Sequence, residues 1–367
     1  MSLPRFDPAE YSAQLAEKTA RFADDFAPLG VSAPEVFASE PLHYRLRAEF
    51  RMWHHGDGLI DYAMFASDDP KTPVLLDDFP AAAAPICALM PRLRDALRAN
   101  EVLRKKIFQV EFLATLSGEL MVSLVYHRAL DAAWEAAARA LAAELGVQII
   151  GRSRKQKIVL DRDWLLEEFE VDGRPLRYQQ IEGSFTQPNG GVNRQMLGWA
   201  RRQVVGVGGD LLELYCGNGN FTMALAPLFD RVLATEVSKS SVRAAHYNIE
   251  ANGVRNITMV RMSSDEISDA FAGGREYRRM KDVDLAGYRF STLFVDPPRS
   301  GLDDATVKLA RSFDRILYIS CNPHTLRDNV AALADSHEIS AAAVFDQFPY
   351  THHLEAGLLL TRRDLAG

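Results

Sequence analysis

The sequence has 367 residues, of which 47% are hydrophobic and 25% charged, a composition typical of a globular protein of about two domains. No apolar run approaches the ~18 residues of a membrane helix, and the first residues lack the features of a signal peptide, so we expect a soluble, cytoplasmic protein. Three widely separated cysteines exclude a disulfide framework, and the net charge of −7 means that any nucleic-acid surface must be local.

The first part of the chain predicts three helices and two β-hairpins. Apolar side chains recur at helical spacing in three segments, and Gly146 is suited to end the last of them. These segments are residues 7–28, 80–100 and 131–145. Two further segments alternate polar and apolar residues around a Gly-containing turn, which predicts hairpins over residues 41–65 and 106–128. We therefore expect an α+β domain over residues 1–180.

From about residue 205 the pattern changes to an alternation of strands and helices. Five short apolar or β-branched runs, LLELYC, RVLATE, NITMVRM, STLFVDPP and RILYISC, are each followed by polar or helical sequence. This spacing predicts a doubly wound parallel sheet, and therefore an α/β fold class. The closing runs AAAVFDQFP and LEAGLLLTRR are joined too tightly for a crossover helix, so we expect an antiparallel pair at the sheet edge.

The segment LLELYCGNGNFTMALA carries the pattern of a nucleotide-binding turn. Gly217 and Gly219 allow backbone amides to approach a ligand where the next helix starts. Glu236 ends the following strand, where a carboxylate can accept hydrogen bonds from ribose hydroxyls. A nicotinamide cofactor fits less well because Thr222 replaces the third glycine of GxGxxG. The pattern favours S-adenosylmethionine, although a Gly-rich turn by itself is equally explained by tight packing.

Three further motifs are expected at the same end of the sheet. VDPPRSGL places Asp296 in a turn stiffened by prolines, and YISCNP places Cys321 at a strand end, where a thiol can act as a nucleophile. Glu355 begins an apolar strand, and burial there raises the pKa of a carboxyl toward that of a general base. A proline turn, a core cysteine and a surface glutamate are the purely structural alternatives. His352 and His353 do not indicate zinc, because adjacent histidines rarely bind one metal ion.

Together these motifs resemble the tRNA (uracil-5-)-methyltransferase family, of the TrmA type. LYCGNGNF, FVDPPRSGL, YISCNP and FPYTHHLEAG have the order and spacing of that family, and YRLRAEFRMWH and FTQPN extend the resemblance over nearly the whole chain. It implies a Rossmann-like, S-adenosylmethionine-dependent methyltransferase domain over residues 181–367 and an RNA-binding domain over residues 1–180. Related rRNA-directed enzymes often carry clustered cysteines for an iron–sulfur site and an N-terminal barrel. This chain lacks such cysteines and has no room before residue 40 for the barrel, so we expect the tRNA branch, with no metal and no cluster.

The resemblance implies methylation of the T-loop uridine of tRNA, position 54, at C5 of the uracil. Cys321 would add to C6, so that C5 can attack the methyl group of S-adenosylmethionine, and Glu355 would then remove the C5 proton. The residues that the resemblance places in the S-adenosylmethionine site are Gln187, Tyr215, Asn220, Glu236 and Asp296.

The resemblance also implies that the N-terminal domain holds the T-arm while the target base is turned out of its stack. Arg45, Arg47 and Arg51 fall on one face of a predicted strand and are candidates for phosphate contacts, as is the basic run over residues 152–157. Phe185 could stack on a base. Solvated charges and a core aromatic explain these residues equally well. Transfer-messenger RNA, through a T-arm-like hairpin, is a further expected partner, and we expect a monomer.

Three other functions remain open from the residues. A methyltransferase acting on an amine or a small molecule would use the Asp-Pro-Pro turn and have no use for Cys321. A protein that opens and refolds the tRNA elbow would keep that function in a Glu355 variant. A dehydrogenase would bind nicotinamide in place of S-adenosylmethionine.

Overall fold

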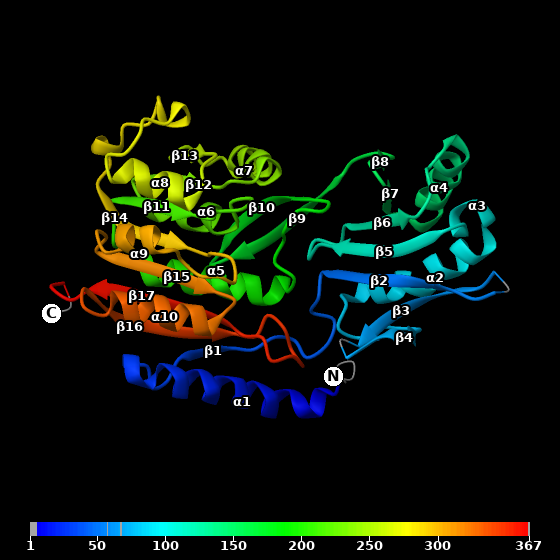
Figure 1. Ribbon diagram of the computed structural model, residues 1–367, viewed down its shortest axis with the longest axis horizontal. Coiled ribbons are helices and arrows are strands. Elements are labelled where there is room, and N and C mark those ends of the chain that lie inside the picture. Colours follow the sequence, from blue (N-terminus) through cyan, green and yellow to red (C-terminus); the bar gives the residue numbers. More distant parts are fainter. Residues whose placement is uncertain (1–5, 57, 67, 366–367) are drawn as a thin grey trace. The chain divides into compact units, whose positions relative to one another are not determined.

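The chain folds as two units in the computed structural model, which describes residues 6–56, 58–66 and 68–365 (Figure 1). The first unit contains residues 40–168 and 180–190, together with the described residues before residue 10. The second contains residues 10–39, 169–179 and the described residues from 191 onward. No helix in these described ranges is long and apolar enough to cross a bilayer.

The first unit is built on a seven-stranded sheet with helices on one face (Figure 1). Its strands are β2 (Arg47–His54), β3 (Ile60–Ala66), β4 (Asp69–Leu76), β5 (Ile107–Ala114), β6 (Leu120–Tyr126), β7 (Gln148–Ser153) and β8 (Gln156–Val159). Its helices are α2 (Ala84–Ala99), α3 (Glu101–Arg104) and α4 (Ala132–Leu145). The strand order is β4-β3-β2-β5-β6-β7-β8. Only the neighbours β6 and β7, which α4 connects, run parallel.

The predicted elements of this unit are confirmed. Both hairpins and the two Ala-rich helices are present, and Gly146 ends α4 with a φ of 69°. In β2 the burial of successive residues alternates, so that Phe50 and Met52 are buried while Arg51 is exposed. The buried face packs against α2 and α4 in one core that includes Trp134. The opposite face of the sheet is therefore the one that carries the arginines.

The second unit is built on an eight-stranded sheet in the order β1-β16-β17-β15-β14-β11-β12-β13. Its strands are β1 (Glu35–Phe37), β11 (Asp210–Leu214), β12 (Arg231–Thr235), β13 (Ile257–Val260), β14 (Phe290–Val295), β15 (Arg315–Ser320), β16 (His337–Phe345) and β17 (Glu355–Arg362). The five strands from β11 to β15 run parallel, as predicted. β17 is antiparallel to both β15 and β16, which confirms the predicted antiparallel pair, and β1 extends the sheet beyond β16.

Helices cover both faces of this sheet (Figure 1). The helices are α1 (Pro8–Phe26), α5 (Gly190–Val204), α6 (Asn220–Leu225), α7 (Lys239–Ala251), α8 (Ser264–Phe271), α9 (Asp304–Ala310) and α10 (Pro323–Leu333). One core holds residues of α1, α8, α9 and α10 against the sheet, and a second holds residues of α5 and α6 against its other face. This three-layer arrangement leaves the carboxyl ends of the parallel strands as the expected place for a ligand.

The units differ from the expected division at residue 180. The predicted helix over residues 7–28 is present as α1, but residues 10–39 belong to the second unit, because Phe22 and Phe26 lie in its core and β1 pairs with β16. The chain passes between the units within a separate two-stranded sheet, formed by β9 (Trp164–Val171) and β10 (Arg174–Ile181). Residues distant in sequence thus complete the second unit.

Gly357 in β17 occupies a position with no room for a side chain. A Cβ there would lie 2.7 Å from the Trp199 ring and 3.0 Å from both Ile319 and Phe345. We expect Gly357→Ala to lower the free energy of unfolding by about 1–3 kcal/mol in denaturant titrations. Gly198→Ala is the matched control, because its Cβ would come no closer than 3.7 Å to a neighbour and alanine favours a helix. Equal losses in the two variants would contradict this packing argument.

Candidate active site

The first part of the site is the turn between β11 and α6. Tyr215, Gly217 and Gly219 have positive φ angles of 59°, 57° and 84°, so the backbone reverses sharply here. Glu236 lies at this turn, and its carboxylate accepts hydrogen bonds from the Gly217 amide at 3.0 Å and the Ser238 amide at 2.6 Å. A Cβ on Gly217 would meet nothing within 4 Å, so the turn is open to a ligand. The expected pairing of a glycine turn with a strand-end carboxylate is therefore present.

The other residues expected around S-adenosylmethionine have different surroundings. The Asn220 side chain exchanges two hydrogen bonds with Asn193, at 2.8 and 3.0 Å, which leaves one amide hydrogen and one oxygen lone pair for a ligand. The Asn220 carbonyl also accepts a hydrogen bond from the Tyr178 hydroxyl at 2.9 Å. Tyr215 is half-buried, and this burial raises its pKa. Gln187 belongs to the first unit, and its place beside the cofactor stays a prediction.

The strand-end cysteine and the glutamate face each other across two neighbouring strands. Ser320 pairs with Ala356 at the end of the antiparallel ladder between β15 and β17. One further step in this register sets Cys321 opposite Glu355. Facing residues of antiparallel strands have Cβ atoms about 5 Å apart and point to the same side. The register predicts a thiol and a carboxyl side by side at the carboxyl end of β15, and the charge of Glu355 does act on Cys321.

Burial and neighbouring charges shift the pKa values of this group. Burial, with the charge of Asp296, raises the pKa of Glu355 to about 8, and Arg299 opposes the shift. Burial, with the charges of Glu355 and Asp296, raises the pKa of Cys321 to about 11, again against Arg299. Burial raises the pKa of Asp296 to about 7. Glu355 therefore has the shifted pKa of a general base, as expected, and Cys321 rests as a thiol.

A further buried carboxyl, which the sequence analysis did not single out, is close enough to Asp296 for its charge to act on it. Glu213 in β11 is fully buried, and burial raises its pKa to about 8. The signal was present as the one acid inside the apolar run LLELYC. Cys216 in the same segment is buried in the second core, where it acts as a packing residue.

The loop that carries Arg299 is tied to the start of α10. The Arg299 carbonyl accepts hydrogen bonds from the Asn322 side-chain amide at 2.9 Å and from the Thr325 hydroxyl at 3.2 Å. Asn322 also caps α10 by accepting from the His324 amide at 3.2 Å. Asn322, which follows Cys321, thus binds the loop that follows Asp296. Hydrogen bonds therefore join the two strand-end motifs.

The three arginines predicted to contact RNA, Arg45, Arg47 and Arg51, do not form one exposed row. Arg51 is exposed, whereas Arg47 is half-buried and its guanidinium donates to the Ser184 carbonyl at 3.0 Å. Arg45 precedes β2, is half-buried, and has a pKa lowered by burial. Of these three arginines, Arg51 is therefore the one that is exposed. Phe185 is 72% exposed, which does not fit the alternative of a core aromatic.

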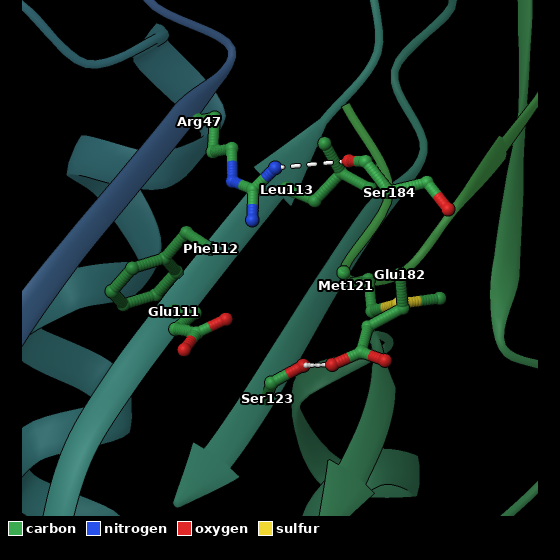
Figure 2. Close-up of a pocket in the computed structure, with 9 residues that line it drawn as sticks. Arg47, Glu111, Phe112, Leu113, Met121, Ser123, Glu182 and Ser184 are labelled. Atoms are coloured by element: carbon green, nitrogen blue, oxygen red, sulfur yellow. Dashed lines mark hydrogen bonds between the residues drawn. The ribbon is translucent and has the colours of Figure 1, made fainter. Parts of the chain in front are cut away.

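Arg47 opens onto a small pocket on the arginine face of the first unit. Figure 2 shows the Arg47 guanidinium at its upper edge and the Glu182 carboxylate, which accepts from Ser123 at 2.9 Å, at its lower edge. Glu182 also forms ion pairs with Arg152 at 2.5 Å and Lys157 at 3.1 Å. Two members of the predicted basic run are therefore engaged by a buried carboxylate.

Arg51 instead belongs to a stack that the sequence analysis missed. Its guanidinium lies 3.9 Å from the centre of the Phe108 ring, and the His127 ring stacks on Phe108 with centroids 4.0 Å apart. Arg51 and His127 are exposed and Phe108 is half-buried. These residues come from β2, β5 and the end of β6, and only the pairing of the strands brings them together.

Metal-binding side chains do not gather in the part of the chain that the structure describes. Within it, no three or more His, Cys, Asp or Glu residues are placed to hold one ion. A glycine turn with a strand-end carboxylate such as Glu236 is an arrangement typical of sites for a nucleoside with free ribose hydroxyls.

Comparisons with known proteins agree on one family. The sequence model of the tRNA (Uracil-5-)-methyltransferase family matches residues 10–363. The tRNA/tmRNA (uracil-C(5))-methyltransferase of Azoarcus sp. is 76% identical over 362 residues, which cover 99% of each chain. The protein of that name from Aromatoleum aromaticum is 74% identical over 363 residues, covering 99% of this chain and 98% of its own.

A solved structure shows the same fold. Pyrococcus abyssi tRNA (uracil-54, C5)-methyltransferase in complex with S-adenosyl-L-homocysteine superposes with a TM-score of 0.74 at 20% identity. The match covers 96% of this chain and 83% of that chain. The expected Rossmann-like fold is thereby confirmed.

Burial of Glu355 makes stability depend on pH. Its pKa of about 8 lies above the ordinary value of 4.5, so between these values the folded chain holds a proton that the unfolded chain has released. Stability from this group is full below the ordinary pKa and falls as the pH rises toward 8. At about pH 8 we expect Glu355→Gln to be more stable than the wild type by about 2 kcal/mol. Below about pH 5 we expect it to show no such gain in stability.

Thermal unfolding at both pH values measures this difference. Glu338→Gln, at an exposed position of β16, is the control and should show no such gain. A Glu355→Gln variant whose stability relative to the wild type is the same at both pH values would show that the carboxyl is not desolvated.

Proposed function

Because this chain belongs to the tRNA (uracil-5-)-methyltransferase family, we propose that it transfers a methyl group from S-adenosylmethionine to C5 of a uracil in tRNA. The observation that carries the proposal is that the charge of Glu355 acts on Cys321 at the end of the β15–β17 ladder, in a unit that also has a glycine turn bound by Glu236. We further propose the T-loop uridine, position 54, as the target, which rests on the family resemblance. Transfer-messenger RNA is a second proposed substrate, since the names of the bacterial relatives include it. A cytoplasmic monomer fits this role.

We propose Cys321 as the nucleophile. Uracil C5 is a poor nucleophile until a thiolate adds to C6 and the C5=C6 electrons move toward the C4 carbonyl as an enolate. S-adenosylmethionine supplies the electrophilic methyl group that C5 then takes. Arg299 is the positive charge acting on the thiol, and it favours the thiolate that burial disfavours.

We propose Glu355 as the base that completes the reaction. The methylated ring still carries a proton at C5, and a carboxylate facing the Cys321 sulfur is close to that carbon. Removal of this proton re-forms the C5=C6 bond and expels the thiolate, so that the enzyme is regenerated. Since the pKa of Glu355 is about 8, this step becomes faster as the pH rises through 8.

The proposed cofactor residues have different roles around the glycine turn. We propose that Glu236 binds the ribose hydroxyls, because backbone amides already fix its carboxylate. Asn220 has one donor and one acceptor to offer, and Tyr215 forms the wall of the turn. From the family resemblance we also propose Gln187 and Asp296 as cofactor residues, and the charge of Asp296 acts on both Cys321 and Glu355.

The exposed face of the first unit is the proposed RNA-binding surface. The stack of Arg51, Phe108 and His127 combines a cation with two ring faces, and such groups bind phosphates and unstacked bases. Arg45 and Arg47 are half-buried and bonded within the unit, so we propose that they shape this surface more than they contact RNA. Phe185 is sufficiently exposed to stack on a base.

A T-arm hairpin with 5-fluorouridine at position 54 tests the reaction. Fluorine cannot leave C5 as a proton, so incubation with S-adenosylmethionine should trap a methylated protein–RNA adduct that mass spectrometry maps to Cys321. Cys321→Ala should form none, and Cys87→Ala should form it normally. Intact binding of RNA and S-adenosylmethionine without an adduct would favour an amine methyltransferase or an RNA-remodelling protein.

Binding of the same hairpin tests the proposed RNA surface. We expect Phe108→Ala to weaken binding by about 1–3 kcal/mol, the usual contribution of a base stacked on an aromatic ring. Arg51→Ala should weaken binding and lower the salt dependence by about one counterion. Arg139→Ala, an exposed arginine of α4 paired with Glu135, is the control. If all three variants bind equally well, the surface lies elsewhere.

A further inference from the structure

One face of α1 contacts the connection between β16 and β17. Tyr11, Gln14, Lys18 and Arg21 are spaced by three or four residues, so their side chains lie on the same side of the helix. The connection covers residues 346–354 and ends directly before Glu355. Both partners belong to the second unit.

Lys18 makes the central contact. Its ammonium donates to the Asp346 carboxylate at 2.8 Å and to the Phe348 carbonyl at 2.9 Å. Lys18 is 3% exposed and Asp346 is fully buried. Burial lowers the pKa of Lys18, and the charge of Asp346 opposes this shift. A lysine is rarely buried so completely without a specific partner, and separating a buried ion pair is costly. The Lys18 ammonium therefore fixes the positions of Asp346 and the Phe348 carbonyl, at the start of the connection.

Two further side chains of the same helix face bind the backbone of the connection. Gln14 accepts a hydrogen bond from the Tyr350 amide at 2.5 Å, and the Arg21 guanidinium donates to the His352 carbonyl at 3.2 Å. Tyr350 has a φ of 62°, an uncommon conformation for a non-glycine residue. These contacts hold alternate backbone groups of the connection up to the residues just before Glu355.

Apolar packing already attaches α1 to its unit. Phe22 and Phe26 stack on each other with centroids 4.3 Å apart, and both are buried in the core. The polar contacts at Lys18 and Gln14 are therefore not needed to attach the helix. Their distinct effect is to fix the backbone of residues 346–354.

We propose that Lys18 is a positioning residue for Glu355, acting through the connection that α1 holds. The inference rests on the proposed function and deepens it. In the step that depends on Glu355, its carboxylate takes the C5 proton and the C5–H electrons form the C5=C6 bond. The C6–S bond then breaks and returns the thiolate of Cys321. A displaced connection affects this last step, whereas Cys321 and the cofactor turn lie on other elements.

The test uses the full-length chain with both buried charges removed, as Lys18→Met with Asp346→Asn. A single-turnover reaction with a natural T-arm hairpin and radiolabelled S-adenosylmethionine is quenched in denaturant, and methylated RNA is separated into protein-bound and free forms. We expect release to slow by about 100-fold, as for a catalytic group misplaced by about 1 Å, while the methylated adduct accumulates. Glu355→Gln should show the same accumulation.

The controls separate a positioning role from a general loss of structure. Glu17→Met, an exposed change on the same helix, should behave as the wild type. If the double variant does not fold, Gln14→Ala, which leaves no buried charge unpaired, gives the same readout. Unchanged release overturns the inference, and so does a parallel fall in adduct formation and release. Failure of the proposed function is distinct, because the wild type and Glu355→Gln would then form no adduct at all.

Discussion

Hydrogen bonds between β15 and β17 determine which side chains meet where the parallel strands end. Five parallel strands bring the glycine turn and the Asp-Pro-Pro loop to this edge, but none of them supplies a base opposite Cys321. The antiparallel strand does so, because its first residue is Glu355. A slip of one residue in this pairing would turn Glu355 to the other face of the sheet. The candidate chemistry therefore depends on a strand register.

The electrostatics of the site follow from the same arrangement. Glu213, Asp296 and Glu355 are carboxyls with raised pKa values, and Arg299 is the cation that acts on the thiol. Burial raises the pKa values of these three acids to between about 7 and 8, which reduces the negative charge of the site near pH 7. Charge then develops mainly on the reacting atoms, where protein dipoles and Arg299 can respond to it.

Local sequence signals predicted the elements and the strand-end residues, because both depend on short-range patterns. Such patterns predict each parallel strand, the antiparallel pair and the glycine turn with Glu236, all of which are present. The stack of Arg51, Phe108 and His127 was not, because it exists only once three strands pair. The observed units differ from the predicted boundary at residue 180 for the same reason. Helix α1 has an amphipathic pattern that does not say which unit covers its apolar face.

The assignment of α1 to the second unit has a consequence for biosynthesis. Lys18 and Asp346 are 328 positions apart, so α1 binds a segment that the ribosome makes 328 residues later. The first unit can complete its sheet from residues 40–190 while translation continues. The second unit cannot, because β1 pairs with β16 and α1 binds the connection after β16, both of which are made long after α1 and β1. A chain that stops before β16 thus leaves the apolar face of α1 partly uncovered, and such exposed surface favours aggregation.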